Sequence, residues 1–148
     1  MLGQHQLGAS TIVSRTSLTA PTTDTVKAAL FLTSATINAA TTVYAATGEV
    51  SGTGYTAGGV TVTNATAPTS TNTSATAGVA YWTPSASITY TTVTLSTAFD
   101  TVLLYNFTQS LKAISVHTFG SQTITAGTFT LTMPSNTTST ALLRLATT

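Results

Sequence analysis

The stretch TVLLYNF at residues 101–107, followed after a short link by KAISVHTF at residues 112–119, decides the fold. The first run is apolar almost throughout, which predicts a strand that is buried on both faces. The second run also has the length of a strand, and the short link between the two is typical of a β-hairpin. We therefore expect an antiparallel pair of strands in the core of the protein.

Further runs of strand length lie between turns rich in glycine, proline and hydroxyl residues. Strict alternation in TFTLTM predicts that Phe129, Leu131 and Met133 share one face. A shift of apolar parity between Tyr90 and Val93 predicts a β-bulge. With no convincing helix, seven to nine short strands predict an all-β fold, either an antiparallel β-sandwich or a partly open barrel. The additional predicted strands are residues 26–33, 60–63, 79–83, 87–95, 123–133 and 141–146.

The chain divides into an N-terminal arm, residues 1–24, and one β domain, residues 25–148. The arm is rich in threonine and serine and has no clear periodicity, and it lacks the pattern of a signal peptide. Within the domain, residues 48–59 contain five glycines, which predicts a shaped loop with positive φ angles at several positions. Residues 64–78 form a low-complexity bridge that we expect to be exposed.

Hydroxyl groups replace charges as the polar component of this chain. It contains 39 threonines and 15 serines, whereas charged residues make up 5% and the net charge is +1. No basic patch is present to neutralise phosphates or to attract an anionic membrane, so we expect neither nucleic-acid nor membrane partners. A nearly uncharged monomer has little self-repulsion to keep it in solution. We therefore interpret the low charge as a sign either that the protein is part of an assembly or that it carries attached sugars.

Residues capable of catalysis or metal binding are sparse. The chain has no cysteine, and its two histidines, His5 and His117, have no carboxylate within four residues. A triad of His117, Asp100 and a hydroxyl is conceivable, but no strained nucleophile elbow accompanies it. Asp24 and Asp100 are interpreted as turn or cap residues. We therefore expect no metal, no cofactor and no enzymatic activity.

Aromatic residues are the candidates for contact with a partner. Tyr55 lies within the glycine-rich loop, and either packs over that loop or anchors a partner. Tyr81 and Trp82 lie on a predicted strand, where a core or interface role is favoured over a platform for sugars that would also include Tyr90.

Several segments resemble those of small virion proteins of tailed bacteriophages. Residues 49–62, EVSGTGYTAGGVTV, look like a segment of those proteins, as does the preceding VKAALFLTSA at residues 26–35. Further along, VLLYN at residues 102–106 and VHTFGSQTITAGTFTLTMP at residues 116–134 resemble later blocks in the same order. Thr118 stands where those proteins usually have an aspartate.

The resemblance implies a capsid decoration or cement protein, or alternatively a neck, tail or fibre component of the virion. It implies major capsid protein or other virion proteins as partners, and assembly in the cytoplasm of the host. A homo-oligomer, trimeric or higher, is expected because such proteins repeat symmetrically and bind by many weak contacts.

Overall fold

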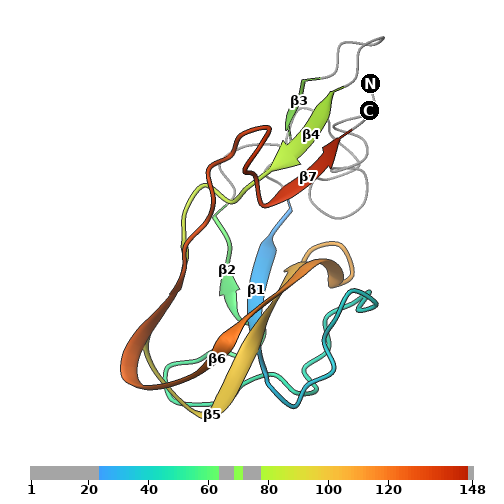
Figure 1. Ribbon diagram of the computed structural model, residues 1–148. Helices are drawn as coiled ribbons and strands as arrows, with labels where there is room; N and C mark the ends of the chain where they lie inside the picture. The colour runs from blue at the N-terminus through green and yellow to red at the C-terminus, as the bar shows by residue number, and fades with distance from the viewer. Residues whose placement is uncertain (1–23, 64–68, 72–77, 147–148) are drawn as a thin grey trace.

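The computed structural model describes residues 24–63, 69–71 and 78–146, which form seven β-strands and no helix (Figure 1). The predicted arm lies outside the described residues except for Asp24, as does most of the predicted bridge. The strands are β1 (Val26–Leu32), β2 (Val60–Thr61), β3 (Thr69–Ser70), β4 (Val79–Trp82), β5 (Ile88–Asn106), β6 (Lys112–Leu131) and β7 (Leu143–Ala146).

The strands form two antiparallel sheets. The larger has the order β2-β1-β5-β6 and the smaller has the order β3-β4-β7, with every pairing antiparallel. The all-β prediction is thus confirmed, and the described strands close no barrel. Figure 1 places the smaller sheet at one end of the molecule, beyond β1 and β2.

The hairpin predicted from the sequence is present, but its strands are much longer than expected. The four short strands predicted between residues 87 and 133 are two continuous strands, the 19-residue β5 and the 20-residue β6. Residues 96–100 and 120–122 do not end the strands, because β5 and β6 stay paired across them with shifts of register. The prediction of short strands was therefore wrong here: bulges bend a paired ladder without terminating it.

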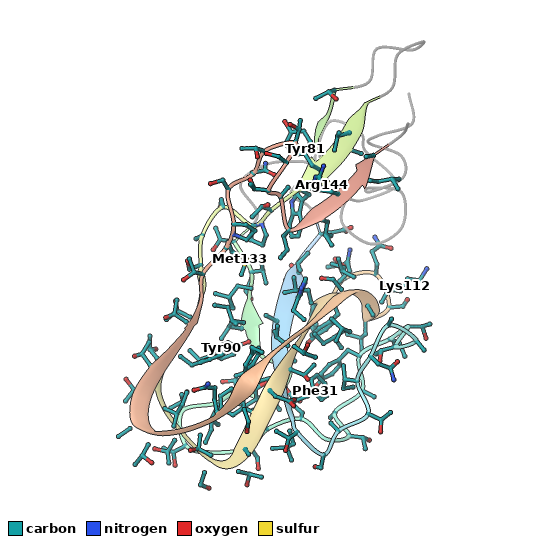
Figure 2. The ribbon with its side chains drawn as sticks, in the orientation of Figure 1. Phe31, Tyr81, Tyr90, Lys112, Met133 and Arg144 are labelled. Atoms are coloured by element: carbon teal, nitrogen blue, oxygen red, sulfur yellow. The ribbon has the colours of Figure 1, made fainter. Side chains whose placement is uncertain are left out.

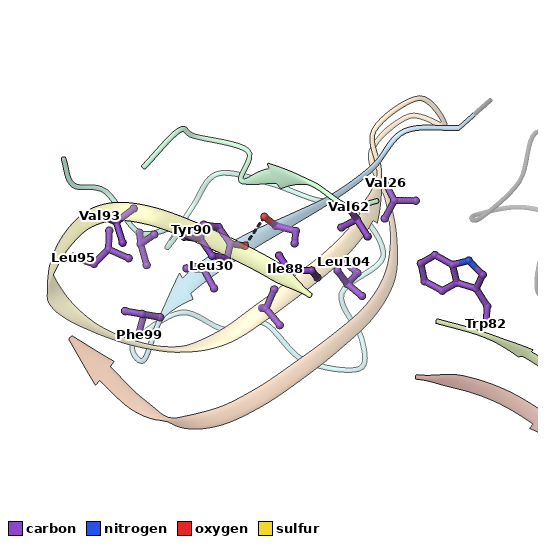
Figure 3. Close-up of a cluster of buried hydrophobic side chains, with 13 residues drawn as sticks. Val26, Leu30, Val62, Trp82, Ile88, Tyr90, Val93, Leu95, Phe99 and Leu104 are labelled. Atoms are coloured by element: carbon purple, nitrogen blue, oxygen red, sulfur yellow. Dashed lines mark hydrogen bonds between the residues drawn. The ribbon is translucent and has the colours of Figure 1, made fainter. Parts of the chain in front are cut away.

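The bulge predicted between Tyr90 and Val93 is confirmed. The register with β6 shifts between these two residues, and Thr92 has a positive φ of 52°. With the other shifts, it bends the first half of β5 over the core. As a result, the Tyr90 hydroxyl donates a buried hydrogen bond to the Ala28 carbonyl of β1, 2.8 Å away (Figure 3).

The larger sheet is buried on both faces along β1 and the second half of β5. On one face, Val26 and Leu30 pack with Leu104, with the folded-over half of β5 and with Trp82 (Figure 3). On the other face, Phe31 and Tyr105 belong to a second, smaller cluster. Residues 101–106 are all buried, as predicted, whereas Phe107 lies beyond the end of β5 and is 48% exposed, so the prediction was wrong at this last position. Phe129, Leu131 and Met133 all pack against the first cluster, as the alternation predicted.

Candidate functional site

Glu49, the only glutamate of the chain, lies at the centre of the most elaborate polar network. The segment that carries it runs beside β1: Val50 N–H donates to the Leu30 carbonyl over 3.0 Å. One carboxylate oxygen accepts the Tyr44 hydroxyl at 2.6 Å. The other accepts the Tyr55 hydroxyl at 2.7 Å and the Gly58 N–H at 2.8 Å. Glu49 therefore joins the segment at Tyr44 to two positions of the glycine-rich loop.

Four tyrosines surround this carboxylate and complete the network. The Tyr44 and Tyr105 rings stack with their centroids 4.5 Å apart, and those of Tyr55 and Tyr90 stack 5.9 Å apart. The Tyr55 hydroxyl accepts Leu30 N–H at 3.0 Å, and the Tyr105 hydroxyl donates to the Gly58 carbonyl at 2.8 Å. Each of the four hydroxyls thus has a partner inside the chain.

Burial is the largest cause of a raised pKa at all four tyrosines. It raises the pKa of Tyr44, Tyr55 and Tyr90 well above the ordinary value, with Glu49 adding to the effect, and raises that of Tyr105 to about 12. The hydroxyls are consequently protonated at neutral pH and act as hydrogen-bond donors. They do not supply a phenolate base.

The glycines of the loop permit close approach of the backbone. Positive φ angles occur at four of the five, as predicted, namely Gly48, Gly54, Gly58 and Gly59. A Cβ atom on Gly59 would lie 1.7 Å from the Ala28 carbonyl oxygen, and one on Gly52 would lie 2.0 Å from that of Thr94. The glycine-rich segment therefore packs directly on β1 and β5, and its composition follows from that packing.

A second carboxylate fastens the start of β1 to the turn between β5 and β6. Asp24 is buried, and it accepts hydrogen bonds from the side chains of Asn106 at 2.9 Å and of Thr108 and Gln109 at 3.2 Å. The sequence predicted a local turn or cap residue, whereas these partners are more than 80 positions away. Only the tertiary fold brings them together.

The structure does not join the residues of the conceivable triad. His117 Nε2 lies 2.9 Å from the Ser115 hydroxyl, and burial lowers the pKa of His117. The Asp100 carboxylate instead accepts the Thr101 hydroxyl at 2.8 Å. Among the described residues, no hydrogen bond joins Asp100 to His117, and no three His, Asp or Glu side chains gather as a metal site would require.

The three predicted partner-contact residues lie in different environments. Tyr55 is half-buried, and its hydroxyl is engaged by Glu49 and Leu30. Tyr81 is half-buried on β4 (Figure 2). Its neighbour Trp82 is only 1% exposed and packs into the larger core cluster. Because side chains alternate along a strand, Tyr81 and Trp82 point to opposite faces of the small sheet. The three therefore do not make one continuous surface.

The surface of the described residues is almost free of charge. Of their six charged side chains, only Lys112 and Arg144 are exposed, and Lys27, Glu49 and Asp100 are half-buried. Asp24 is buried, and Glu49 is held by its internal hydrogen bonds. Lys27 lies with its ammonium 4.5 Å from the centre of the Phe107 ring, a cation–π contact. Sequence reasoning found the scarcity of charge, but not that the fold withdraws charges from the surface.

No family model, curated protein or solved structure matches this chain. No helix in the described part of the chain is long and apolar enough to cross a membrane.

Proposed function

We propose that this chain is a structural, non-enzymatic protein of a bacteriophage virion, and that it decorates the assembled capsid as a cement protein. Its body is a β-sandwich in which the folded-over hairpin provides the second layer. The observation that carries the proposal is the almost uncharged surface, on which Lys112 and Arg144 are the exposed charges of the described residues. The resemblance of residues 49–62 to a segment of phage virion proteins supports the same class.

An uncharged, hydroxyl-rich surface suits permanent contact with other proteins. Burying an ion in an interface costs free energy unless the ion is well paired, whereas threonine and serine hydroxyls find partners in backbone groups or water. A cement protein repeats over a symmetric lattice, so many weak contacts combine into firm attachment. Such a role requires a rigid shape and no reactive group.

The glycine-rich segment supports this interpretation, because its polar groups are used to hold the fold. The Glu49 carboxylate and the Tyr55 hydroxyl both form hydrogen bonds with partners inside the chain. In this proposal, the segment that resembles phage virion proteins stabilises the fold and does not form a reaction centre.

The proposal is tested with particles purified from a phage mutant that lacks the gene for this chain. The chain, carrying a gold-labelled C-terminal tag, is added to the particles and imaged by negative stain. We expect label over the whole head surface. Because the surface is nearly uncharged, attachment should persist at about 1 M salt, where the Debye length is about 3 Å. Label confined to the neck or tail would favour the alternative virion location, and absence of label would overturn the proposal.

A truncation tests the contribution of the predicted arm. Removing residues 1–22 keeps Asp24 and its bonds to Asn106, Thr108 and Gln109, so the body should unfold at the same temperature as the full chain. We expect weaker attachment to the particles. Unchanged attachment would show that the arm has no part in binding.

A further inference from the structure

The outer edge of β6 is a long strand edge that has no partner over most of its length in the described part of the chain. In the larger sheet β6 pairs only with β5, and its outer side is covered at the start, where Ala113 N–H donates to the Thr42 carbonyl over 3.0 Å. Beyond that point no described residue pairs with its outer backbone groups. The other edge strands, β2, β3 and β7, have two, two and four residues.

This edge lacks most of the devices that keep strand edges apart. Proteins usually protect an edge with charges, with proline, with bulges or by keeping it short. From residue 113 to residue 133 the chain has no charged residue and no proline. Bulges are present, but they leave Ser115–Thr118 in unbroken register with β5. An unpaired row of N–H and C=O groups of this kind selects an extended polypeptide strand as its ligand.

A groove beside this stretch supplies additional contact surface. It has a volume of about 500 Å³ and lies between residues 37–41 and residues 113–118. Ile37 packs on the same buried cluster as Val116, so residues 37–41 flank the edge from one face of the sheet. The lining is apolar or hydroxylic, with Asn38 as its amide group. An uncharged strand fits these walls without a desolvation cost for ions.

We propose that a second copy of this chain occupies the edge, with the two β6 strands antiparallel about a two-fold axis at Val116. This goes beyond the proposed function, because it concerns contact between copies, and it replaces the trimer or higher oligomer expected from the resemblance with a dimer. The regular stretch is Ser115–Thr118, between the bulge at Ile114 and the register shifts at residues 119–121, and the axis is placed at Val116 because that residue lines the groove. Two-fold antiparallel pairing places residues of the same face opposite each other, so Val116 faces the partner's Val116 and Ser115 faces the partner's His117.

Charge favours a second copy as the occupant. The paired edges carry no charge, so identical strands meet without repulsion. The nearest exposed charge is Lys112, and in this register the two Lys112 residues lie roughly 26 Å apart along the strands, at about 3.3 Å per residue. That separation exceeds the Debye length of about 8 Å at physiological salt. The pairing therefore has no electrostatic barrier.

Cysteine variants test the proposal cleanly, because the natural chain has no cysteine. Val116→Cys places two thiols on the two-fold axis, where opposite Cα atoms of paired strands lie about 4.5–5.5 Å apart, within the range of a disulfide. Gln122→Cys, on the same strand and more exposed, is the matched control. In a glutathione redox buffer, Val116→Cys should form covalent dimers at least about tenfold faster than Gln122→Cys, since pairing raises the effective concentration.

A second measurement does not depend on the cysteine variants folding. The natural chain should give the mass of a dimer by light scattering at high concentration. Thr118→Lys, an exposed substitution on the edge, should give a monomer, whereas Thr61→Lys on the opposite edge strand should remain a dimer. A monomeric or trimeric natural chain, or faster cross-linking at Gln122, would overturn the proposal. None of these experiments uses phage particles, so their outcome is independent of the capsid test.

Discussion

The polar groups around Glu49 and those along the outer edge of β6 differ in where their hydrogen-bond partners lie. Around Glu49, a carboxylate, four tyrosine hydroxyls and backbone groups of the glycine-rich segment are all paired inside the chain. Along β6, the outer backbone groups of the stretch Ser115–Thr118 have no partner among the described residues, and no residue there carries a charge. One region is rich in internal hydrogen bonds, and the other offers hydrogen bonds to a partner.

The difference indicates where stability and recognition reside in this protein. A charge inside the fold is tolerated because its hydrogen bonds replace the lost solvation. An edge needs no internal partner, because water satisfies it until another strand displaces the water. Substitutions around Glu49 should therefore change the free energy of unfolding, whereas substitutions along β6 should change association.

The largest expected effect comes from adding one methyl group beneath the glycine-rich segment. In Gly59→Ala the new Cβ would lie 1.7 Å from the Ala28 carbonyl oxygen, at a residue whose φ is +72°. The segment must move off β1, so we expect a loss of about 4 kcal/mol or more in unfolding free energy. Urea denaturation measures it. Gly120→Ala, where a Cβ meets no atom within 4 Å, is the control and should change the value by less than about 0.5 kcal/mol.

Removal of the Glu49 carboxylate should have the next largest effect. Glu49→Ala leaves the Tyr44 and Tyr55 hydroxyls and the Gly58 N–H without their acceptor. We expect a loss of about 3 kcal/mol, because part-buried donors lose hydrogen bonds to a charged group. Glu49→Gln retains one acceptor oxygen and should fall between the variant and the natural chain in thermal denaturation. Equal stability of Glu49→Ala and the natural chain would contradict the role of this network.

Alkaline pH should weaken the same region. The folded-state pKa values of the four tyrosines are raised, that of Tyr105 to about 12, above the unfolded value of about 10. Their contribution is complete below pH 10 and declines from there as pH rises, because the unfolded chain then releases protons that the folded chain retains. Melting temperatures measured from pH 8 to about 12 should fall above pH 10. Tyr105→Phe should make that decline shallower.

The smallest expected effect lies on β6. Thr123 is exposed, so Thr123→Ala should change the unfolding free energy by less than about 0.5 kcal/mol. Urea denaturation in parallel with Glu49→Ala measures the contrast directly. If Thr123→Ala lowered the unfolding free energy as much as Glu49→Ala, the β6 edge would contribute to stability as strongly as the Glu49 network, and the proposed difference between the two regions would be wrong.

Local patterns in the sequence predicted several features of the fold correctly. The parity shift between Tyr90 and Val93 located a bulge, and the apolar run located the fully buried end of β5 at residues 101–106, although not the exposure of Phe107. These succeeded because side-chain alternation is a property of neighbouring residues. The same reasoning divided β5 and β6 into short strands, because a bulge and a chain break look alike in one strand when its partner is unknown.

By itself, the sequence determined the all-β class, the glycine positions that require positive φ and the scarcity of charge, since these follow from composition and local spacing. Only the tertiary structure decided that Glu49 meets Tyr44 and Tyr55, that Asp24 reaches Asn106, and that Trp82 enters the core. The contact of Asp24 with Asn106 follows from the pairing of Val26 with Asn106 between β1 and β5, and Trp82 meets residues of both strands in the core cluster. Local side-chain pattern located one bulge, but it cannot give the register between strands that are distant in the sequence, and such long-range pairing decides which side chains meet.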